Sequence, residues 1–359
     1  MKIFFLIFLF TQIYIKSDPH PLIDLDTYIS DFILEEKQII IPEYPDAFNP
    51  SIVRWYDGRL LLSFRTRDPE TKVANLLGFV WLDEEFEPIS KPSLLRIYSD
   101  FSLKVSKMQG ARILKTGSTY SIVYNNILNT PDQETRRMVV ATLNYDKNSD
   151  TFSITKPKYI LSFDVDKKQW REKNWIPFYY KQHLYLAYSL NPHHIFQLHR
   201  NENTCQNISI TNKHIEWPWG DLHGGTPSIL DNGQFLGFFH SDKDLKTVQS
   251  NGEKITHYFI GAYCFKPTPP FTITAISALP IVGKTFYESD DFPTWKPLKV
   301  VYPTGFVLDK FRVSLVYGRQ DHQCWVVIMD KEKLLKSLQA PEDANCHQVC
   351  PQKKSPLRE

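Results

Sequence analysis

A hairpin-like unit that recurs five times limits the fold of this chain more than any other feature of its sequence. Each unit opens with polar residues, continues with a short apolar run, and reverses at a turn such as Asp57-Gly58. The run after the turn alternates its side chains with the period of two that is typical of a strand. The units are Asn49–Arg65, Gly110–Asn125, Glu172–Ser189, Gly224–His240 and Tyr302–Gly318. Their second runs close on an aromatic residue at Phe64, Tyr124, Tyr188, Phe239 and Tyr317.

Another strand-like run follows each unit. These runs are Asn75–Leu82, Arg137–Leu143, His194–His199, Tyr258–Phe265 and Cys324–Met329. Small antiparallel sheets that recur at intervals of tens of residues are the signature of a propeller. We therefore predict an all-β fold, a five-bladed β-propeller. An ordinary β-sandwich is the alternative, but it does not explain why polar residues precede every hairpin.

The ends of the chain differ from its middle. Met1-Lys2 and the apolar run Ile3–Ile15 predict a signal peptide over residues 1–17, too short to span a bilayer. We expect a secreted or secretory-lumen protein; an uncleaved N-terminal membrane anchor and a buried first strand are the alternatives. Residues 18–40 form a leader in which Leu22–Glu36 is a candidate helix. The propeller covers residues 41–338 and ends in a short helix at Lys331–Leu338, before a polar tail at 339–359.

The charge of the chain gives no support for a nucleic-acid partner, and its cysteines leave the disulfide pairing open. A formal net charge of +2, without a basic run interleaved with aromatics, gives no electrostatic reason for a nucleic-acid partner or a membrane surface. The number of cysteines is odd, so at least one is unpaired within the chain. Their pairing stays open; they are Cys205, Cys264, Cys324, Cys346 and Cys350. We expect no metal site.

The polar openings of the units predict one common site. The innermost strand of each blade lines the channel of a propeller, so these openings converge at one end of it. They include Asn49, Arg112, Lys173, Asn174, Thr226 and Thr304, with Arg65 and His240 nearby at the ends of second strands. Cations, amides and hydroxyls with few carboxylates suit a polyhydroxylated or anionic ligand. The alternative for any single residue is that it caps a strand or a turn.

The order of these motifs resembles glycoside hydrolase family 130, the β-mannoside phosphorylases with their hydrolase and mannosyltransferase relatives. The motifs are Phe48-Asn49-Pro50, Arg112, Lys173-Asn174-Trp175, Gly225-Thr226-Pro227, Phe239-His240 and Tyr317-Gly318 with Asp321. The resemblance covers about residues 44–335. It implies a five-bladed propeller, an oligosaccharide or glycan ligand, inverting chemistry on β-mannosides, and no cofactor beyond inorganic phosphate as a co-substrate. The implied substrate-binding residues are Asn49, Arg65, Arg112, Lys173, Asn174, Thr226, His240, Tyr317 and Asp321. Lys173 and His240 match the family's phosphate-holding lysine and histidine, and Arg65 and Arg112 are candidates for its arginines.

One departure from the family pattern bears directly on whether the protein is catalytic. The family's general-acid aspartate falls at Gly110, which cannot deliver the proton that glycoside cleavage needs. Substitute carboxylates are Asp68, Glu172 and Asp321, and Asp221 also falls near the expected pocket end. We therefore expect a carbohydrate-active protein that hydrolyses, phosphorolyses or transfers β-mannosides, or else a catalytically inactive glycan-binding propeller. Secretion would favour hydrolysis, transfer or binding, because a phosphorolysis product is useful only inside the cell. The sugar, the linkage and the oligomeric state are left open.

Overall fold

The chain folds almost entirely into β-strands. The computed structural model describes residues 22–67, 74–95, 108–129, 134–161, 163, 171–199, 202–211, 214–288 and 296–342. No helix within these ranges is long and apolar enough to cross a membrane. The expected signal peptide, the candidate acid Asp68 and most of the C-terminal tail lie outside the described residues, so secretion and a role for Asp68 stay predictions.

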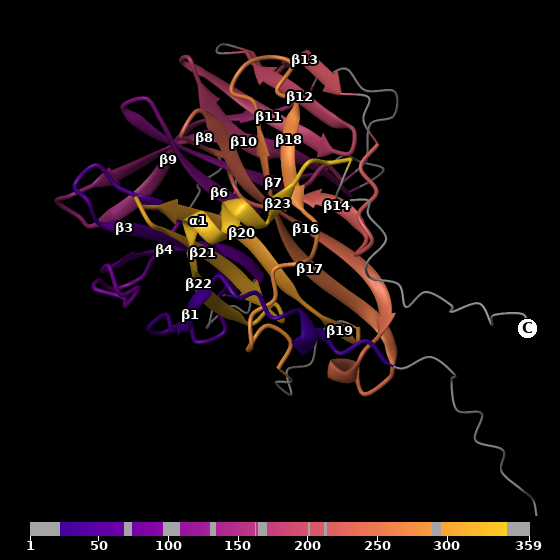
Figure 1. Cartoon of the computed structure of the whole chain (residues 1–359). Coiled ribbons are helices and arrows are strands. Elements are labelled where there is room, and N and C mark those ends of the chain that lie inside the picture. Colours follow the sequence, from indigo (N-terminus) through magenta and orange to yellow (C-terminus); the bar gives the residue numbers. More distant parts are fainter. Residues whose placement is uncertain are drawn as a thin grey trace, which may run out of the picture.

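Four sheets have the four-stranded form of a propeller blade (Figure 1). The first unit gives β2 (Phe48–Arg54), β3 (Leu60–Arg67), β4 (Ala74–Leu82) and β5 (Ser93–Leu94). The second gives β6 (Gln109–Thr116), β7 (Thr119–Asn129), β8 (Glu134–Asp146) and β9 (Thr151–Tyr159). The third gives β10 (Ile176–Tyr180), β11 (His183–Leu190), β12 (His193–Leu198) and β13 (Cys205–Thr211). The fifth gives β20 (Val301–Leu308), β21 (Arg312–Arg319) and β22 (Gln323–Asp330), completed by β1 (Ile33–Ile39).

The sheet of the fourth unit corrects the expectation of five like blades. It holds seven strands, because its inner strand is split and its third and outer strands each pair with one extra short strand. The strands are β14 (Asp221–Gly224), β15 (Ile229–Asp231), β16 (Gln234–Lys246), β17 (Lys254–Phe265), β18 (Ile273–Ser277), β19 (Leu298–Lys299) and β23 (Leu338–Gln339). The split falls at Gly225–Ser228, where Pro227 has no N–H to donate to the ladder. The all-β, propeller-like arrangement is confirmed, with four regular blades rather than five.

The inner strands meet in a closed ring. β2 contacts both β20 and β6, β6 contacts β10, β11 contacts β14, and β16 contacts β20. Direct hydrogen bonds join neighbouring units across this ring: the Ile113 amide donates to Ser51 Oγ at 3.2 Å, and the Ser228 amide donates to the Pro177 carbonyl at 3.0 Å. The polar openings of the units therefore lie at one end of the ring and the hairpin turns at the other.

The hydrophobic core lies between neighbouring sheets. Leu61 packs in a cluster with Ile122 of the second unit, whereas Leu62 packs in a cluster with Val316 of the fifth. Consecutive strand residues point to opposite faces, so the second strand β3 contributes to two clusters. This is why the second runs of the units are apolar on both faces rather than strictly alternating.

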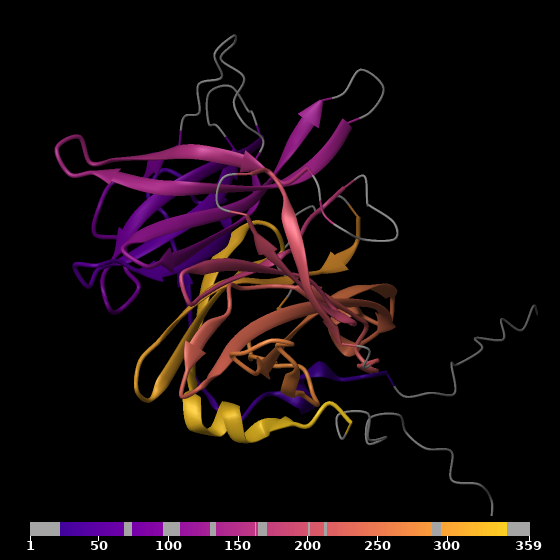
Figure 2. The ribbon, with the colours of Figure 1, turned by 90° about the horizontal axis from the view of Figure 1, so that it is seen from above.

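Both ends of the described chain pack on the same side of the molecule (Figure 2). The leader does not form the expected helix at Leu22–Glu36: it forms the short 3-10 helix η1 (Leu25–Tyr28) and then β1. Strand β1 pairs with β22, so the propeller begins at Ile33 rather than at residue 41. A second 3-10 helix, η2 (Val248–Ser250), caps the hairpin between β16 and β17, and α1 (Lys331–Ser337) confirms the closing helix.

Three of the cysteines are free thiols. Cys205, Cys264 and Cys324 are buried and unpaired. Burial raises the pKa of Cys205 and of Cys264 to about 12 and raises that of Cys324 as well. These thiols are therefore protonated and poorly reactive at neutral pH. Cys346 and Cys350 lie outside the described residues.

Candidate functional site

Three neighbouring units present their opening residues in the same unusual backbone conformation. Asn49, Gly110 and Asn174 have positive φ angles of 49°, 58° and 63°. The first two stand at β-bulges, where the register shifts between Phe48 and Ser51 and between Gln109 and Arg112. Asparagine and glycine adopt this left-handed conformation more readily than other residues. The bulges re-aim the chain at the end of the ring, which is how these openings converge.

We call the residues that gather there the head cluster. It consists of Asn49, Arg65, Gly110, Arg112, Lys173, Asn174, His240, Tyr302 and Asp321, most of them predicted from the sequence. The contacts among them show which side chains hold the cluster together and which remain for a ligand.

Tyr302 is the centre of the head cluster, and the sequence analysis did not select it. Its hydroxyl donates to Asn174 Oδ1 at 2.7 Å and accepts from Arg112 Nη2 at 3.3 Å. Its ring lies edge-on to that of His240, with the centroids 4.7 Å apart. A Cβ built on Gly110 would lie 3.8 Å from the same hydroxyl. One tyrosine of the fifth unit thus contacts the openings of the second and third units and the fourth unit's second strand.

Arg112 is a fully buried cation that ties the second unit to the fourth. Its Nε donates to the Gly225 carbonyl at 2.5 Å, Nη1 to the Gly110 carbonyl at 2.6 Å, and Nη2 to the Gly224 carbonyl at 3.2 Å. Backbone carbonyls carry partial negative charge and so compensate the guanidinium without an acidic partner. The arrangement gives Arg112 a structural role, and its contact with a ligand stays a prediction.

His240 lies almost fully buried in the cluster. Burial lowers its pKa well below the ordinary value, and the neighbouring His223, Arg112 and Lys173 act in the same direction. The imidazole is therefore neutral at neutral pH and offers one donor and one acceptor nitrogen. Lys173 is exposed at the edge of the cluster, where an ammonium remains available for an anionic or hydroxylated ligand.

Arg65 and Asp321 form the second charged part of the cluster. Burial lowers the pKa of Arg65 to about 10, with the charge of Asp321 opposing the shift. Its guanidinium lies over the Phe48 ring, 4.6 Å from the centroid. Burial raises the pKa of Asp321, although Arg65, His322 and a hydrogen bond with Asn49 act against it. Asp321 therefore holds a proton to a higher pH than an exposed aspartate does.

A carboxylate that the sequence analysis missed lies at the rim. Asp242 Oδ1 accepts from His223 Nε2 at 3.2 Å, and the His223 ring lies 5.3 Å from that of His240. The hydrogen bond from His223 lowers the pKa of Asp242, and Lys173 lowers it further. The sequence could have indicated Asp242, because it follows His240 by two residues in a strand and so lies on the same face.

Other predicted residues support the frame instead. The Thr226 hydroxyl donates to the Pro227 carbonyl at 2.8 Å and accepts from the Phe238 amide at 3.0 Å, which closes the split in the inner strand. Thr304 donates from its hydroxyl to the Pro50 carbonyl and ties β20 to β2. Neither hydroxyl proton is left for a ligand.

Tyr317 and Glu172 are buried away from the contacts that define the cluster. The Tyr317 ring packs 4.7 Å from that of Phe286, in the core. Glu172 is 2% exposed, and its Oε2 accepts from the indole N–H of Trp175 at 3.2 Å. Asp221 is exposed, across the ladder from Asp242.

Comparisons with known proteins identify solved structures that share this fold. No protein-family model matches this sequence, and no curated protein matches it. A proposed glycoside hydrolase from Parabacteroides distasonis is 17% identical, with a TM-score of 0.59 over 88% of this chain and 95% of that one. A mannose phosphorylase from Leishmania mexicana, solved with a phosphate ion, is 10% identical, with a TM-score of 0.52 over 86% and 91%.

A third structure comes from work on the family that the motifs resemble. It is described with the family 130 mannoside phosphorylases, which contain glycoside hydrolases that target β-1,2-mannosidic linkages in Candida mannan. It is 15% identical, with a TM-score of 0.53 over 80% of this chain and 85% of that one. The chain therefore has the fold of the family 130 mannoside phosphorylases and their relatives.

Proposed function

We propose that the head cluster binds a β-linked mannoside glycan and that the protein is carbohydrate-active, cleaving or transferring that glycan with inversion. The observation that carries the proposal is the convergence of several units on Tyr302, in the fold of proteins described as acting on mannosides. The head cluster holds amide, imidazole, ammonium and guanidinium groups in position beside aromatic rings. Such groups match the hydroxyls and the apolar faces of a sugar.

The proton donor in this proposal is Asp321, in place of the family's residue at position 110. A general acid must hold its proton at the working pH, and burial shifts the pKa of Asp321 in that direction. The pKa of Asp242 is lowered instead, so this residue suits the role of a base or of a carboxylate that binds a hydroxyl. Where inorganic phosphate is the attacking group, Lys173 and the neutral imidazole of His240 would hold it. Hydrolysis and mannosyl transfer would use the same acid.

A second candidate function, glycan binding without turnover, is favoured by the surroundings of Gly110. The three atoms nearest to a Cβ built there are Arg112 Nη1 at 3.2 Å, Asn125 Nδ2 at 3.7 Å and the Tyr302 hydroxyl at 3.8 Å. None of the three is a carboxylate. All three belong to groups that can hydrogen-bond a carboxylate, although a Cβ there would be tight against Arg112 and the positive φ strains any side chain.

The test compares wild type with Gly110→Asp, Gly110→Ala and Asp321→Asn on β-mannosides, with and without phosphate. Binding is measured by calorimetry and turnover by released sugar. Wild-type turnover that Asp321→Asn lowers by about 10²–10⁴-fold, with binding kept, supports the enzyme. Binding without wild-type turnover, and activity gained in Gly110→Asp alone, supports the second candidate. Gly110→Ala controls for the left-handed backbone, which strains aspartate and alanine alike. Absence of any mannoside binding would overturn both.

A further inference from the structure

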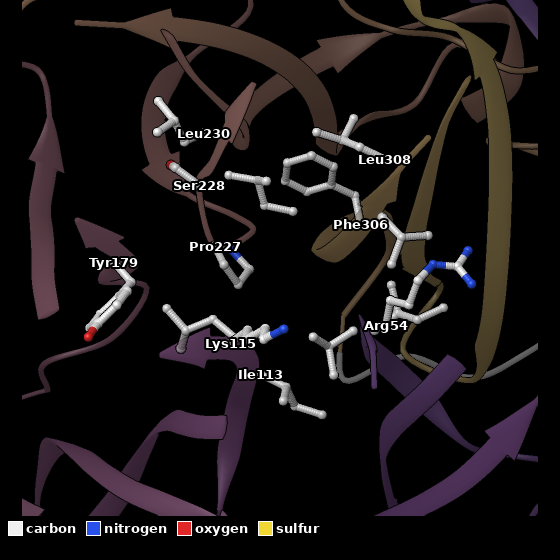
Figure 3. A pocket seen from close by; sticks show the side chains of 14 residues that line it. Arg54, Ile113, Lys115, Tyr179, Pro227, Ser228, Leu230, Phe306 and Leu308 are labelled. Atoms are coloured by element: carbon white, nitrogen blue, oxygen red, sulfur yellow. The ribbon is translucent and has the colours of Figure 1, made fainter. Parts of the chain in front are cut away.

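The inner strands that begin at the head cluster end at a separate cavity of about 290 Å³ (Figure 3). Its lining comes from the far ends of β2, β6 and β20, from β10, and from the segment that leads into β15. The lining begins at Ile52 and Ile113, three residues along their strands from Asn49 and Gly110, a rise of roughly 10 Å, so the cavity lies nearer the hairpin turns than the head cluster does. No residue of the head cluster lines the cavity.

The walls of this cavity are mostly apolar. Ile52, Ile113, Pro227 and Phe306 are buried strand or strand-entry residues, and their side chains surround the space. The hydroxyl of Ser228 also lines it but is bonded to the Tyr263 hydroxyl at 3.1 Å. Such walls offer few hydrogen-bonding groups to a sugar, which distinguishes the cavity chemically from the head cluster.

Two cations stand among the lining residues, and only one has its charge compensated by a partner. The Arg54 guanidinium makes a two-point contact with the Glu84 carboxylate, at 2.5 and 3.0 Å, and also donates to the Gly58 carbonyl at 2.8 Å. Within the described part of the chain, the exposed Lys115 side chain makes no ion pair or hydrogen bond. In Figure 3 Lys115 lies between Ile113 and Pro227, at the cavity.

We propose that this cavity is a second binding site, for a small amphiphilic anion with an apolar body and one carboxylate head. Binding would remove the apolar surface of the walls and of the ligand body from water. This burial is the main driving force for filling an apolar cavity. The carboxylate would pair with the Lys115 ammonium at the mouth. Asp309, near Arg54, forms no ion pair with Lys115, and its Oδ1 accepts from the amides of Phe311 and Arg312 at 2.7 Å each. The proposal does not depend on the mannoside function.

The experiment titrates the full-length protein with sodium octanoate, with 3-phenylpropanoate and with neutral octanamide, by calorimetry. We expect saturable one-site binding of a carboxylate, and the two carboxylates report whether an alkyl or an aryl body fits. Octanamide should bind about tenfold more weakly, because a charged hydrogen bond is lost. Lys115→Met keeps the length of the side chain and should weaken carboxylate binding by a similar factor.

Matched variants locate the site. Lys254→Met removes an exposed lysine that does not line the cavity and should leave octanoate binding unchanged. Failure of wild type to bind either carboxylate saturably would overturn the proposal. So would equal affinities of wild type and Lys115→Met, or of octanoate and octanamide.

Discussion

The Tyr302 hydroxyl donates a hydrogen bond to Asn174 Oδ1 at 2.7 Å, which joins two residues that are 128 positions apart in the sequence. The same hydroxyl accepts from Arg112, which also donates three hydrogen bonds to backbone carbonyls. The openings of the second, third and fifth units are therefore held in one hydrogen-bonded network. Because a ligand site is only as well defined as the groups that position it, this network determines the geometry of the head cluster.

Tyr302→Phe should weaken both stability and glycan binding. It removes the hydroxyl and leaves Asn174 Oδ1 and an Arg112 N–H without this partner, which costs about 1–3 kcal/mol in the free energy of unfolding. Urea denaturation measures the loss, and titration with a β-mannoside measures affinity. Tyr56→Phe is the matched control, since Tyr56 is 59% exposed and its variant should stay within about 0.5 kcal/mol of wild type. Equal effects of the two variants would contradict the role given to Tyr302.

The sequence could not have selected Tyr302 over Tyr317, for a geometric reason. Directly opposed residues of an antiparallel pair share a face, and Tyr302 is paired with Gly318 whereas Pro303 is paired with Tyr317. Tyr317 therefore points to the other face, into the core. A motif places a residue within about one position, but one position in a strand reverses the side chain.

The strands themselves were predictable, because each is short, apolar and bounded by turn residues. All five third strands fall where the sequence predicted them, for example β12 at His193–Leu198. Two features were not predictable from local pattern. The pairing of β1 with β22 joins segments about 300 residues apart, and the mixed apolar and acidic residues of β1 also fit a helix. The split inner strand of the fourth unit leaves the Gly224 and Gly225 carbonyls to bind Arg112, a residue of another unit.

Gly224→Ala should be far more destabilising than an alanine substitution at a turn glycine. A Cβ at Gly224 would lie 1.8 Å from the Asn174 carbonyl oxygen, a backbone atom, so the strands would have to separate. Overpacking of this kind costs typically 1–3 kcal/mol or more, and here it also disturbs the carbonyls that hold Arg112. Gly233→Ala is the control, because nothing lies within 4 Å of its Cβ and only its left-handed backbone is strained. Chemical denaturation of both variants decides between these expectations.

Glu36→Gln should loosen the strand that completes the fifth sheet. The Glu36 carboxylate accepts from the Lys284 amide at 2.7 Å, from the Thr285 amide at 3.0 Å and from the Thr285 hydroxyl at 2.6 Å. A glutamine has one acceptor oxygen, and its NH₂ group would face a donor. We expect a loss of about 1.5–3 kcal/mol and faster amide exchange along β1. Glu35→Gln changes the exposed neighbour on the same strand and should alter neither quantity; similar exchange rates in both variants would refute the role of Glu36.

His193 makes stability depend on pH in a defined direction. Its side chain is 1% exposed, and its Nδ1–H donates to the Phe271 carbonyl at 2.9 Å. Burial lowers the pKa of His193 to about 4, against roughly 6.5 in an unfolded chain. Between these values the unfolded state binds the extra proton. The free energy of unfolding therefore falls as the pH drops from about 6.5 to about 4, by at most about 1.4 kcal/mol per pH unit from this residue.

His193→Asn separates the titration from the hydrogen bond. The asparagine amide can replace the Nδ1–H donor to Phe271 but takes up no proton, so the slope of unfolding free energy against pH should decrease between pH 6 and 4.5. Urea denaturation at half-unit pH steps measures that slope for wild type, for His193→Asn and for His199→Asn, which changes an exposed histidine. His240 is also buried and neutral, so part of the wild-type slope should remain in the His193 variant. An unchanged slope in His193→Asn would show that the acid sensitivity of this fold arises elsewhere.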